Sequence, residues 1–538
     1  MNKKAYLLLL VPILFIVFLF VKDKDFSFST KPKPNLLVVQ MEAFQDFVLK
    51  RDINGKEITP NLNKLIKESA YFSNMYQQNG VGSTSDAEFM FNTSLYPLKP
   101  PLAASTGASQ QEFKSLPRLL EDKGYNTMTF HTNAAVFWNR KELYSALGFN
   151  EFYDKKSFEE KDVVAFGSSD DVLYKRTAEL LNEQPKDKPY YAQVVSMSSH
   201  YPFRLPENLK EMTLPDMYKD TITGDYIQAA NYADAALGRF IKKLKENGTW
   251  DNTVFAVYGD HRGIDVAYLD NEKEKAAMKD FLGRDYDEVD SLHIPFIIHA
   301  PNMKGQEITR VGGHLDMMPT IASILDINMK KSDAFGHNLF EDNNYVVGIR
   351  GEYAPEGTLF VDDKYYNPET KKLININTHK EEQIKDNKYE VLKKELLNEF
   401  NKSDKVIAKL PKKKETFGRE LTVMQKVALY KEPDENSKTS ITLPAKTTVD
   451  SFETKPGDWY QITWENKKYW IRIKNPILEG WSFLKMSGEI PLYKEPGQTG
   501  KPAMKVVSQN LFVSKEWKGE GWYRVFTWAG KDLWVKNK

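Results

Sequence analysis

Leu36-Leu-Val-Val-Gln-Met41 is a short apolar run that ends at the acidic residue Glu42. A run of this length, bounded on both sides by polar residues, is typical of a strand buried inside a parallel sheet. Similar runs recur along the chain and alternate with amphipathic segments. Strands separated by helices predict an α/β fold, in which a mostly parallel sheet is covered by helices on both faces.

The other predicted elements follow the same pattern. The predicted strands are Thr127–His131, Tyr191–Ser196, Val254–Tyr258 and Pro295–His299. The predicted helices are Asn61–Ala70, Tyr226–Lys245 and Asp316–Leu325. In open α/β sheets, ligands bind at the carboxyl ends of the strands. The residues that directly follow each strand are therefore the first candidates for chemistry.

The N-terminus predicts a membrane anchor. Lys3 and Lys4 precede an unbroken apolar run, Ala5–Val21, which as a helix would span roughly 25 Å and so approach the thickness of a bilayer core. A cleaved signal peptide is the alternative, but no small-x-small cleavage site follows the run. We expect a single-pass anchor at residues 1–22, a polar stalk at 23–34, and an extracellular catalytic domain.

Composition excludes several classes of site. The formal net charge of +1 gives no argument for nucleic-acid binding, and the absence of cysteine excludes disulfides, thiolate metal sites and cysteine nucleophiles. The charge is unevenly distributed, because residues 411–538 hold 23 Lys and Arg against 15 Asp and Glu, a local excess of +8. Such a segment suits an anionic surface, for example a wall polymer or lipid headgroups, and the alternative is an ordinary solvated surface.

The C-terminal part contains an internal repeat. Val427-Ala-Leu-Tyr-Lys-Glu-Pro433 recurs as Ile490-Pro-Leu-Tyr-Lys-Glu-Pro496, and eight of the ten tryptophans lie after residue 450. A repeat of this size predicts a duplicated small all-β domain. After the stalk we therefore expect an α/β catalytic domain at 35–400, a basic linker at 401–419, and repeats at 420–476 and 480–538.

Polar residues that could carry chemistry stand at three places in the sequence, two after predicted strands and one after a pair of glycines. Glu42 follows the first strand, and Gly259-Asp260-His261 follows the strand Val254–Tyr258. Carboxylate oxygens and an imidazole nitrogen suit a divalent cation, although each group alone is common on protein surfaces. Between them lies Gly80-Val-Gly-Ser-Thr-Ser-Asp-Ala-Glu-Phe89, which predicts a turn that presents Thr84 at a helix N-terminus. The alternative is a capping box formed by Ser85 and Glu88.

Taken together, these motifs resemble the extracellular domain of lipoteichoic acid synthases, in the sulfatase-like branch of the alkaline phosphatase superfamily. The resemblance extends over roughly residues 34–340. Further matching segments are Thr59–Leu65, Ser94–Pro97, His131–Asn133, Phe137–Arg140, Ser198–Phe203 and Gly312–Thr320. The chain departs from the family in having one candidate membrane segment instead of several, in His314 and Asn133, and in its tandem repeats, which resemble bacterial SH3-like domains.

The resemblance implies a role for each matching residue. Glu42, Thr84, Asp260 and His261 would bind one divalent metal, Mn²⁺ being the usual ion and Mg²⁺ a possible one, with Thr84 as the nucleophile. The implied phosphoglycerol-binding residues are His131, Asn133, Trp138, Arg140 and His200. His200 would also protonate the leaving group.

The resemblance implies a phosphoglycerol transferase that forms a glycerophosphoryl-threonine intermediate. The expected donor is phosphatidylglycerol or a related membrane lipid, and the expected acceptor is a polyol-phosphate polymer or a glycolipid. The repeats would bind cell-wall polymer. Two alternatives stay open: a phosphodiester hydrolase, and a wall-binding protein with an inactive catalytic domain. Sulfate-ester hydrolysis is disfavoured because Ser115-Leu-Pro-Arg118 is one residue too short for the C/S-x-P-x-R motif.

Overall fold

A computed structural model describes residues 33–537 except 342–344, 414–417, 466, 475, 487, 507–508, 518–520 and 527–531. The predicted anchor and nearly all of the predicted stalk lie outside these residues. Among the helices that are described, none combines the length and apolar character needed to cross a bilayer.

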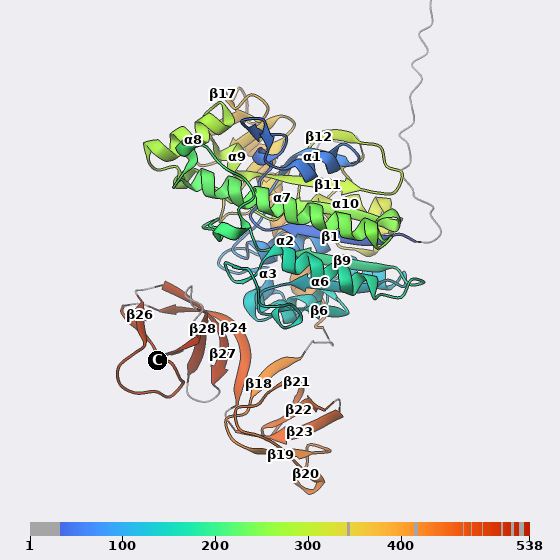
Figure 1. Ribbon diagram of the computed structural model, residues 1–538, viewed down its shortest axis with the longest axis vertical. Coiled ribbons are helices and arrows are strands. Elements are labelled where there is room, and N and C mark those ends of the chain that lie inside the picture. The colour runs from blue at the N-terminus through green and yellow to red at the C-terminus, as the bar shows by residue number, and fades with distance from the viewer. Residues whose placement is uncertain are drawn as a thin grey trace, which may run out of the picture.

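The central element is an eight-stranded sheet (Figure 1). Its strands, in spatial order, are β12 (Gln306–Gly313), β4 (Ala70–Tyr76), β11 (His293–His299), β10 (Thr253–Gly259), β1 (Asn35–Met41), β9 (Tyr190–Val195), β5 (Asn126–His131) and β6 (Glu151–Tyr153). β1 pairs in parallel with both β9 and β10, and in this sheet only β11 runs against its neighbours. The mostly parallel sheet is therefore confirmed, and the carboxyl ends of β1, β5, β9 and β10 share one edge.

Alternate residues of β1 enter two different hydrophobic cores. Leu37 and Val39 pack on the face covered by α6 (Asp170–Asn182), α7 (Ile222–Glu246) and α8 (Glu272–Leu282). Leu36 and Val38 pack on the face covered by α2, α4, α5 and α10. The bounds of those helices are α2 (Thr84–Thr93), α4 (Leu116–Glu121), α5 (Arg140–Leu147) and α10 (His314–Ile324). Burial on both faces explains why the strand is an unbroken apolar run.

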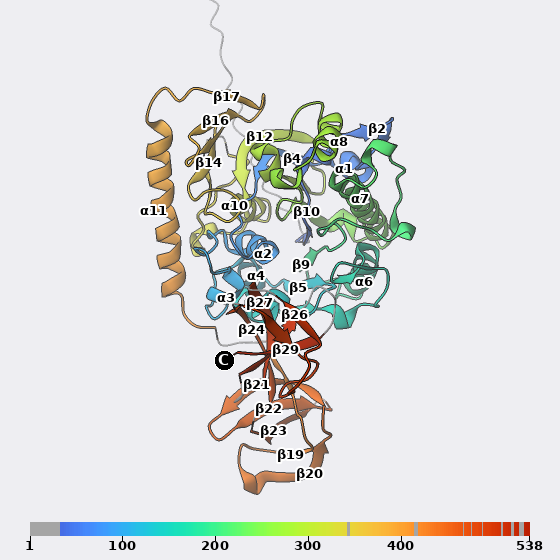
Figure 2. The ribbon, with the colours of Figure 1, turned by 90° about the vertical axis from the view of Figure 1, so that its left-hand side faces the viewer.

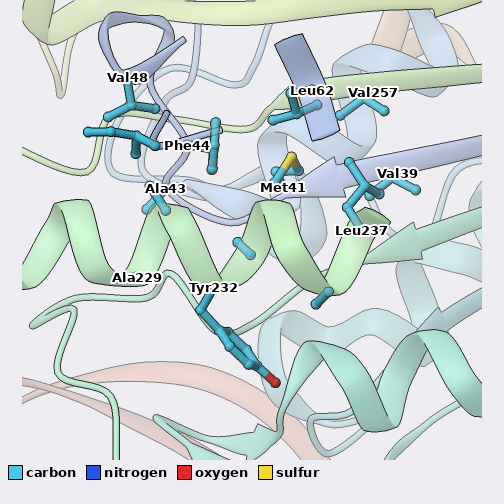
Figure 3. Close-up of a cluster of buried hydrophobic side chains, with 14 of the residues drawn as sticks. Val39, Met41, Ala43, Phe44, Val48, Leu62, Ala229, Tyr232, Leu237 and Val257 are labelled. Atoms are coloured by element: carbon cyan, nitrogen blue, oxygen red, sulfur yellow. The ribbon is translucent and has the colours of Figure 1, made fainter. Parts of the chain in front are cut away.

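Figure 3 shows the first of these cores, where Val39 and Met41 of β1 lie above Ala229 and Leu237 of α7. The long helix α7 also anchors the short helix α1 (Pro60–Ile66). Asp234 is buried on α7 and accepts hydrogen bonds from the backbone N–H groups of Asn61 (3.0 Å) and Leu62 (2.7 Å). These N–H groups belong to the first turn of α1, which otherwise has no side-chain cap.

A second, five-stranded antiparallel sheet follows the central one. Its strands are β13 (Val347–Ile349), β14 (Thr358–Val361), β15 (Lys364–Asn367), β16 (Lys372–Asn375) and β17 (Lys380–Glu382). It is followed by helix α11 (Lys388–Lys409), which runs along one side of the catalytic domain in Figure 2. The expectation of a linker from residue 401 was wrong for its first part, because α11 continues to Lys409 and buries Ser403 and Ile407.

The C-terminal module, defined as strands β18–β29, contains a continuous ten-stranded ladder in which β24 joins the two repeats. Three of its short strands are β19 (Val427–Tyr430), which belongs to the ladder, and β25 (Ile490–Leu492) and β26 (Met504–Val506), which pair only with each other in the described part of the chain. The other strands are β18 (Arg419–Thr422), β20 (Lys438–Leu443), β21 (Thr448–Lys455), β22 (Trp459–Trp464), β23 (Lys467–Arg472), β24 (Ile477–Met486), β27 (Gln509–Trp517), β28 (Trp522–Phe526) and β29 (Asp532–Lys536). Each half has its own hydrophobic cluster, one spanning residues 421–478 and the other 490–535.

The sequence repeat is also a repeat of side-chain packing. The rings of Tyr430 and Trp459 meet edge to face at 4.8 Å, and the rings of Tyr493 and Trp522 do the same at 5.4 Å. A cation lies over the tryptophan in each case: Arg472 is 5.7 Å from the Trp459 ring, and Lys536 is 5.9 Å from the Trp522 ring. The two halves therefore use the same aromatic contacts at matching positions.

The buried carboxylate of Asp234 yields a stability prediction. Asp234→Ala removes the acceptor of the buried Leu62 N–H and the part-buried Asn61 N–H, so we expect the α/β domain to lose about 2–3 kcal/mol of stability. Thermal unfolding monitored by circular dichroism measures this loss, with the exposed Asp251→Ala as the matched control. Equal melting temperatures for the two variants would contradict the assignment.

Candidate metal centre and active site

Two neighbouring strands carry the residues of the candidate metal centre. β1 and β10 pair in register from Asn35↔Thr253 to Met41↔Gly259, so Glu42 and Asp260 leave the sheet side by side. His261 Nε2 lies 3.3 Å from Glu42 Oε1 and 3.5 Å from Asp260 Oδ2. The ligand atoms of these three residues all lie within 4.8 Å of one another. The structure thus brings Glu42 together with Asp260 and His261, which lie far from it in the sequence.

Thr84 joins this group as the first residue of α2. Its Oγ1 lies 3.3 Å from Glu42 Oε2 and 3.4 Å from His261 Nε2. The preceding residue, Ser83, has φ 46° and ψ −118°, a sparsely populated conformation for a residue with a side chain. The hydroxyl of Thr84 is thereby held at a helix N-terminus, where backbone N–H groups favour negative charge.

The loop before α2 is held by a buried carboxylate and not by a capping box. Asp86 accepts hydrogen bonds from the N–H groups of Gly80 (3.2 Å), Gly82 (2.9 Å) and Ala104 (3.0 Å). A Cβ on Gly82 would lie 2.3 Å from Asp86 Oδ1, so only glycine fits there. The alternative of a Ser85–Glu88 capping box was wrong, because the N-cap is Ser83 and no side-chain capping bond forms.

The electrostatics of the three ligands favour a bound cation. Burial raises the pKa of Asp260 to about 8, and the negative charge of Glu42 contributes to this rise. Burial opposes ionisation of Glu42 too, but His261 outweighs it and lowers the pKa of Glu42 to about 2. Burial likewise opposes protonation of His261, but the charges of Asp260 and Glu42 raise its pKa to about 9. Without a metal, the imidazolium and a proton on Asp260 would supply the missing positive charge.

The donor set fits a divalent metal. His261 Nδ1 lies 2.8 Å from the carbonyl oxygen of Arg262. Because a carbonyl oxygen only accepts, Nδ1 carries a proton and Nε2 is directed to the carboxylates, which is the usual arrangement of a metal-binding histidine. Glu42, Asp260 and Thr84 would add oxygen ligands from the same pocket.

His131 is the last residue of β5, and Asn133 follows that strand at the same edge of the sheet. Burial, helped by the charge of Arg140, lowers the pKa of His131 to about 3, so its ring is neutral. Its Nδ1 donates to Val195 O at 2.8 Å, which leaves Nε2 as an acceptor. Asn133 is 2% exposed, its Oδ1 accepts from Ala134 N, and its Nδ2 has no hydrogen-bond partner. A buried amide donor of this kind is available to a ligand oxygen.

Arg140 lies deeper than the resemblance suggested. Its side chain is 1% exposed, and its Nε and Nη2 donate to Glu88 Oε1 at 3.2 and 2.8 Å. The hydroxyl of Tyr144 donates to the other oxygen of Glu88. The Nε and Nη2 edge of the guanidinium is therefore occupied by Glu88. Nη1 donates instead to Phe137 O, at 3.4 Å. Contact with a phosphate by this residue stays a prediction.

Trp138 and His200 are half-buried. Trp138 lies in the short 3-10 helix Phe137–Asn139 that precedes α5, which we call the Trp138 turn. The His200 ring meets Phe166 edge to face at 5.0 Å, and its Nδ1 lies 2.7 Å from Tyr201 O. The charge of His200 contributes to the low pKa of Glu42, so the two side chains interact across the site.

Two further residues support the centre and were not predicted. Gln40 Nε2 donates to Thr84 O (3.2 Å) and lies 3.5 Å from Asp260 Oδ2, so it links the start of α2 to a candidate metal ligand. Tyr353 shares a 2.6 Å hydrogen bond with Ser83 Oγ and stacks on His261 with 6.2 Å between ring centres. A glutamine inside the apolar run of β1 was a visible signal, whereas nothing in the sequence near Tyr353 distinguishes it.

Ser115, from the incomplete sulfatase motif, lies outside this group. It precedes α4, is buried, and donates to Leu147 O. The nucleophile position at the start of α2 is held by Thr84.

Comparison with known proteins supports these assignments at the level of the family. The sequence profile of the sulfatase family matches residues 34–327. Lipoteichoic acid synthase 2 of Bacillus subtilis (strain 168) is 33% identical over 383 residues, which are 69% of this chain and 56% of that protein. Lipoteichoic acid synthase of Staphylococcus aureus (strain USA300) is 36% identical over 355 residues, which are 64% of this chain and 53% of that protein. The chain thus spans about half the length of these relatives.

The crystal structure of the lipoteichoic acid synthase LtaP from Listeria monocytogenes is 36% identical, with a TM-score of 0.66, and the match covers 71% of this chain and 94% of that one. A protein of the alkaline phosphatase superfamily from Vibrio parahaemolyticus shares the fold at 21% identity, with a TM-score of 0.55. The chain therefore belongs to the sulfatase family and is homologous to the lipoteichoic acid synthases.

Proposed function

We propose that this protein is a metal-dependent phosphoglycerol transferase that acts outside the cytoplasm. It moves glycerophosphate from phosphatidylglycerol to a teichoic-acid-like or glycolipid acceptor, and its homology to proteins named lipoteichoic acid synthases supports this proposal. The observation that carries the proposal is the contact of Thr84 Oγ1 with Glu42 and His261, at 3.3 and 3.4 Å. A hydroxyl at a helix N-terminus, beside three metal-binding side chains, is suited to attack a phosphodiester.

In the first half of the reaction, Thr84 Oγ1, which has lost its proton to solvent and reacts as the alkoxide, forms a bond to phosphorus while the phosphorus–oxygen bond to diacylglycerol breaks. The metal, proposed to be Mn²⁺, would lower the pKa of the hydroxyl and neutralise charge on the phosphoryl oxygens. His200 would protonate the leaving oxygen, and the unpartnered Nδ2 of Asn133 would donate to the bound phosphoglycerol.

In the second half, an acceptor hydroxyl loses its proton to His200 and attacks the same phosphorus, which releases Thr84. Dividing the displacement into two steps lets one site serve donor and acceptor in turn. A membrane anchor at residues 1–22 would raise the local concentration of the lipid donor. Binding of cell-wall polymer by the C-terminal module is part of the same proposal.

The covalent intermediate is directly testable. Incubating the full-length protein with phosphatidylglycerol and Mn²⁺, without acceptor, should add one glycerophosphate to the Thr84 peptide, as read by mass spectrometry. Thr84→Ala should lose this adduct and at least about 10³-fold in turnover, because no other group can replace the nucleophile. If the wild type releases only free glycerol phosphate when acceptor is present, the protein is a hydrolase instead.

Gln40 provides a test of the metal centre that leaves every ligand in place. Gln40→Leu removes the hydrogen bonds that orient Asp260 and the start of α2, so we expect Mn²⁺ affinity to fall about 10- to 100-fold. Isothermal titration with Mn²⁺ measures the change, and Gln184→Leu, remote from the centre, is the matched control. Unchanged affinity in the Gln40 variant would remove this residue from the metal site.

Metal binding should also depend on pH. Because Asp260 and His261 have pKa values of about 8 and 9 in the metal-free protein, both are protonated at pH 7 and both must lose a proton to bind a cation. Affinity should therefore rise as pH rises from 6 to 8, by about 10- to 100-fold per unit. Titrations in buffers of different ionisation enthalpy count the protons released, and a pH-independent affinity would contradict the proposed ligand set.

A further inference from the structure

The C-terminal module touches the catalytic domain beside the active site. Both views show the module below the central sheet, next to α3 (Ala104–Gly107) and the β5–β6 side (Figures 1 and 2). Strand β24 lies alongside the Trp138 turn. The element of the catalytic domain that contacts the module is therefore the one that carries Trp138 and leads into Arg140.

Two ion pairs join the module to this region. Lys141, in the first turn of α5, lies 3.1 Å from Asp450 Oδ1 of β21. Lys156 lies 3.2 Å from Glu420 Oε2 of β18. In each pair one partner is largely buried by the contact, since the side chains of Lys141 and Glu420 are 15% and 14% exposed.

The segment that leads from α11 to the module is attached to the same place. Glu112 N donates to Pro411 O at 2.8 Å, and Lys413 N donates to Gln110 O at 3.0 Å. The side chain of Lys413 is 5% exposed and pairs with Glu142 of α5. Residues 411–413 and both ion pairs therefore contact α5 or residues close to it.

The Trp138 turn needs such support, because it is strained. Trp138 and Asn139 both adopt left-handed backbone conformations, with φ 55° and 51°, and two successive non-glycine residues of this kind cost free energy. Asn139 is held from one side by hydrogen bonds from its Nδ2 to Ser105 O (2.8 Å) and Ser109 Oγ (3.2 Å). The module lies against the turn through β24.

We propose that the docked C-terminal module is a positioning element of the active site, which holds the Trp138 turn in the conformation that presents Trp138 to the phosphoglycerol group. The effect on substrate rests on the proposed function, whereas the effect on the turn does not. The module thus contributes to substrate binding in addition to any affinity for wall polymer. Two of its contacts are ion pairs with exposed partners, so docking weakens as ionic strength rises.

Charge reversal in the full-length protein tests this coupling. One variant combines Lys141→Glu with Lys156→Glu, a second combines Asp450→Lys with Glu420→Lys, and a third carries all four changes. We expect each double variant to raise the KM for phosphatidylglycerol about tenfold, as two ion pairs become repulsive, and the quadruple variant to recover. Lys50→Glu, which breaks the exposed Lys50–Glu307 pair (3.2 Å) far from the module, is the matched control.

Hydrogen exchange provides a readout that needs no substrate. Amides 134–141 should exchange faster in both double variants and return to the wild-type rate in the quadruple variant, while α7 stays unchanged in all. A double variant whose segment 134–141 exchanges like the wild type, or a quadruple variant that does not recover, would overturn the proposal. Absence of transfer by the wild type, with the exchange pattern as expected, would instead reject only the proposed function.

Discussion

Two carboxylates buried at the ends of adjacent parallel strands are the constraint around which the catalytic domain is arranged. The register of β1 with β10 brings Glu42 and Asp260 together in a region where water cannot screen their repulsion. The protein offsets part of this cost with local donors, since Ala43 N and His261 N each donate to Asp260 Oδ1 at 2.7 Å. The remaining negative charge would favour a bound cation, so the same burial that opposes folding of the metal-free protein would support binding of the proposed metal.

Thr84, the proposed nucleophile, is held in place by two buried carboxylates, each of which is paired within the protein. Asp86 uses both oxygens on backbone N–H groups of the loop, and Glu88 is neutralised by the buried guanidinium of Arg140. A buried pair of this kind contributes little to stability by itself, but the loss of one partner would leave an uncompensated charge inside the domain. Glu88 lies one helical turn after Thr84, so its pairing with Arg140 fixes α2 and the start of α5 relative to each other. The rigid support of Thr84 and the position of the Trp138 turn are thus parts of one network.

The sequence predicted those features that depend on local pattern. Apolar runs located five strands of the central sheet, β1, β5, β9, β10 and β11, whereas β4, β6 and β12 were not predicted. The residues after two of the predicted strands, Glu42 and Asp260-His261, met as expected because parallel strands end at one edge. Tyr353 and the Glu88–Arg140 pair could not be predicted, since each depends on contacts between distant segments. The error at α11 had a different cause. Its lysines resemble a linker, but Leu396, Phe400 and Ile407 recur at helical spacing, and that narrow apolar face is what the helix buries.

Helix α5 joins two parts of the molecule with different kinds of contact. Successive residues of a helix point about 100° apart, and here Arg140 points inward to Glu88 while Lys141 points outward to Asp450. The inward contact is fully buried and rigid. The outward contact is an ion pair whose partner is 46% exposed, which is weak enough to open and close. A module attached in this way can respond to the ionic environment while the inward pair of Arg140 with Glu88 stays closed, because that pair is buried on the other side of the helix.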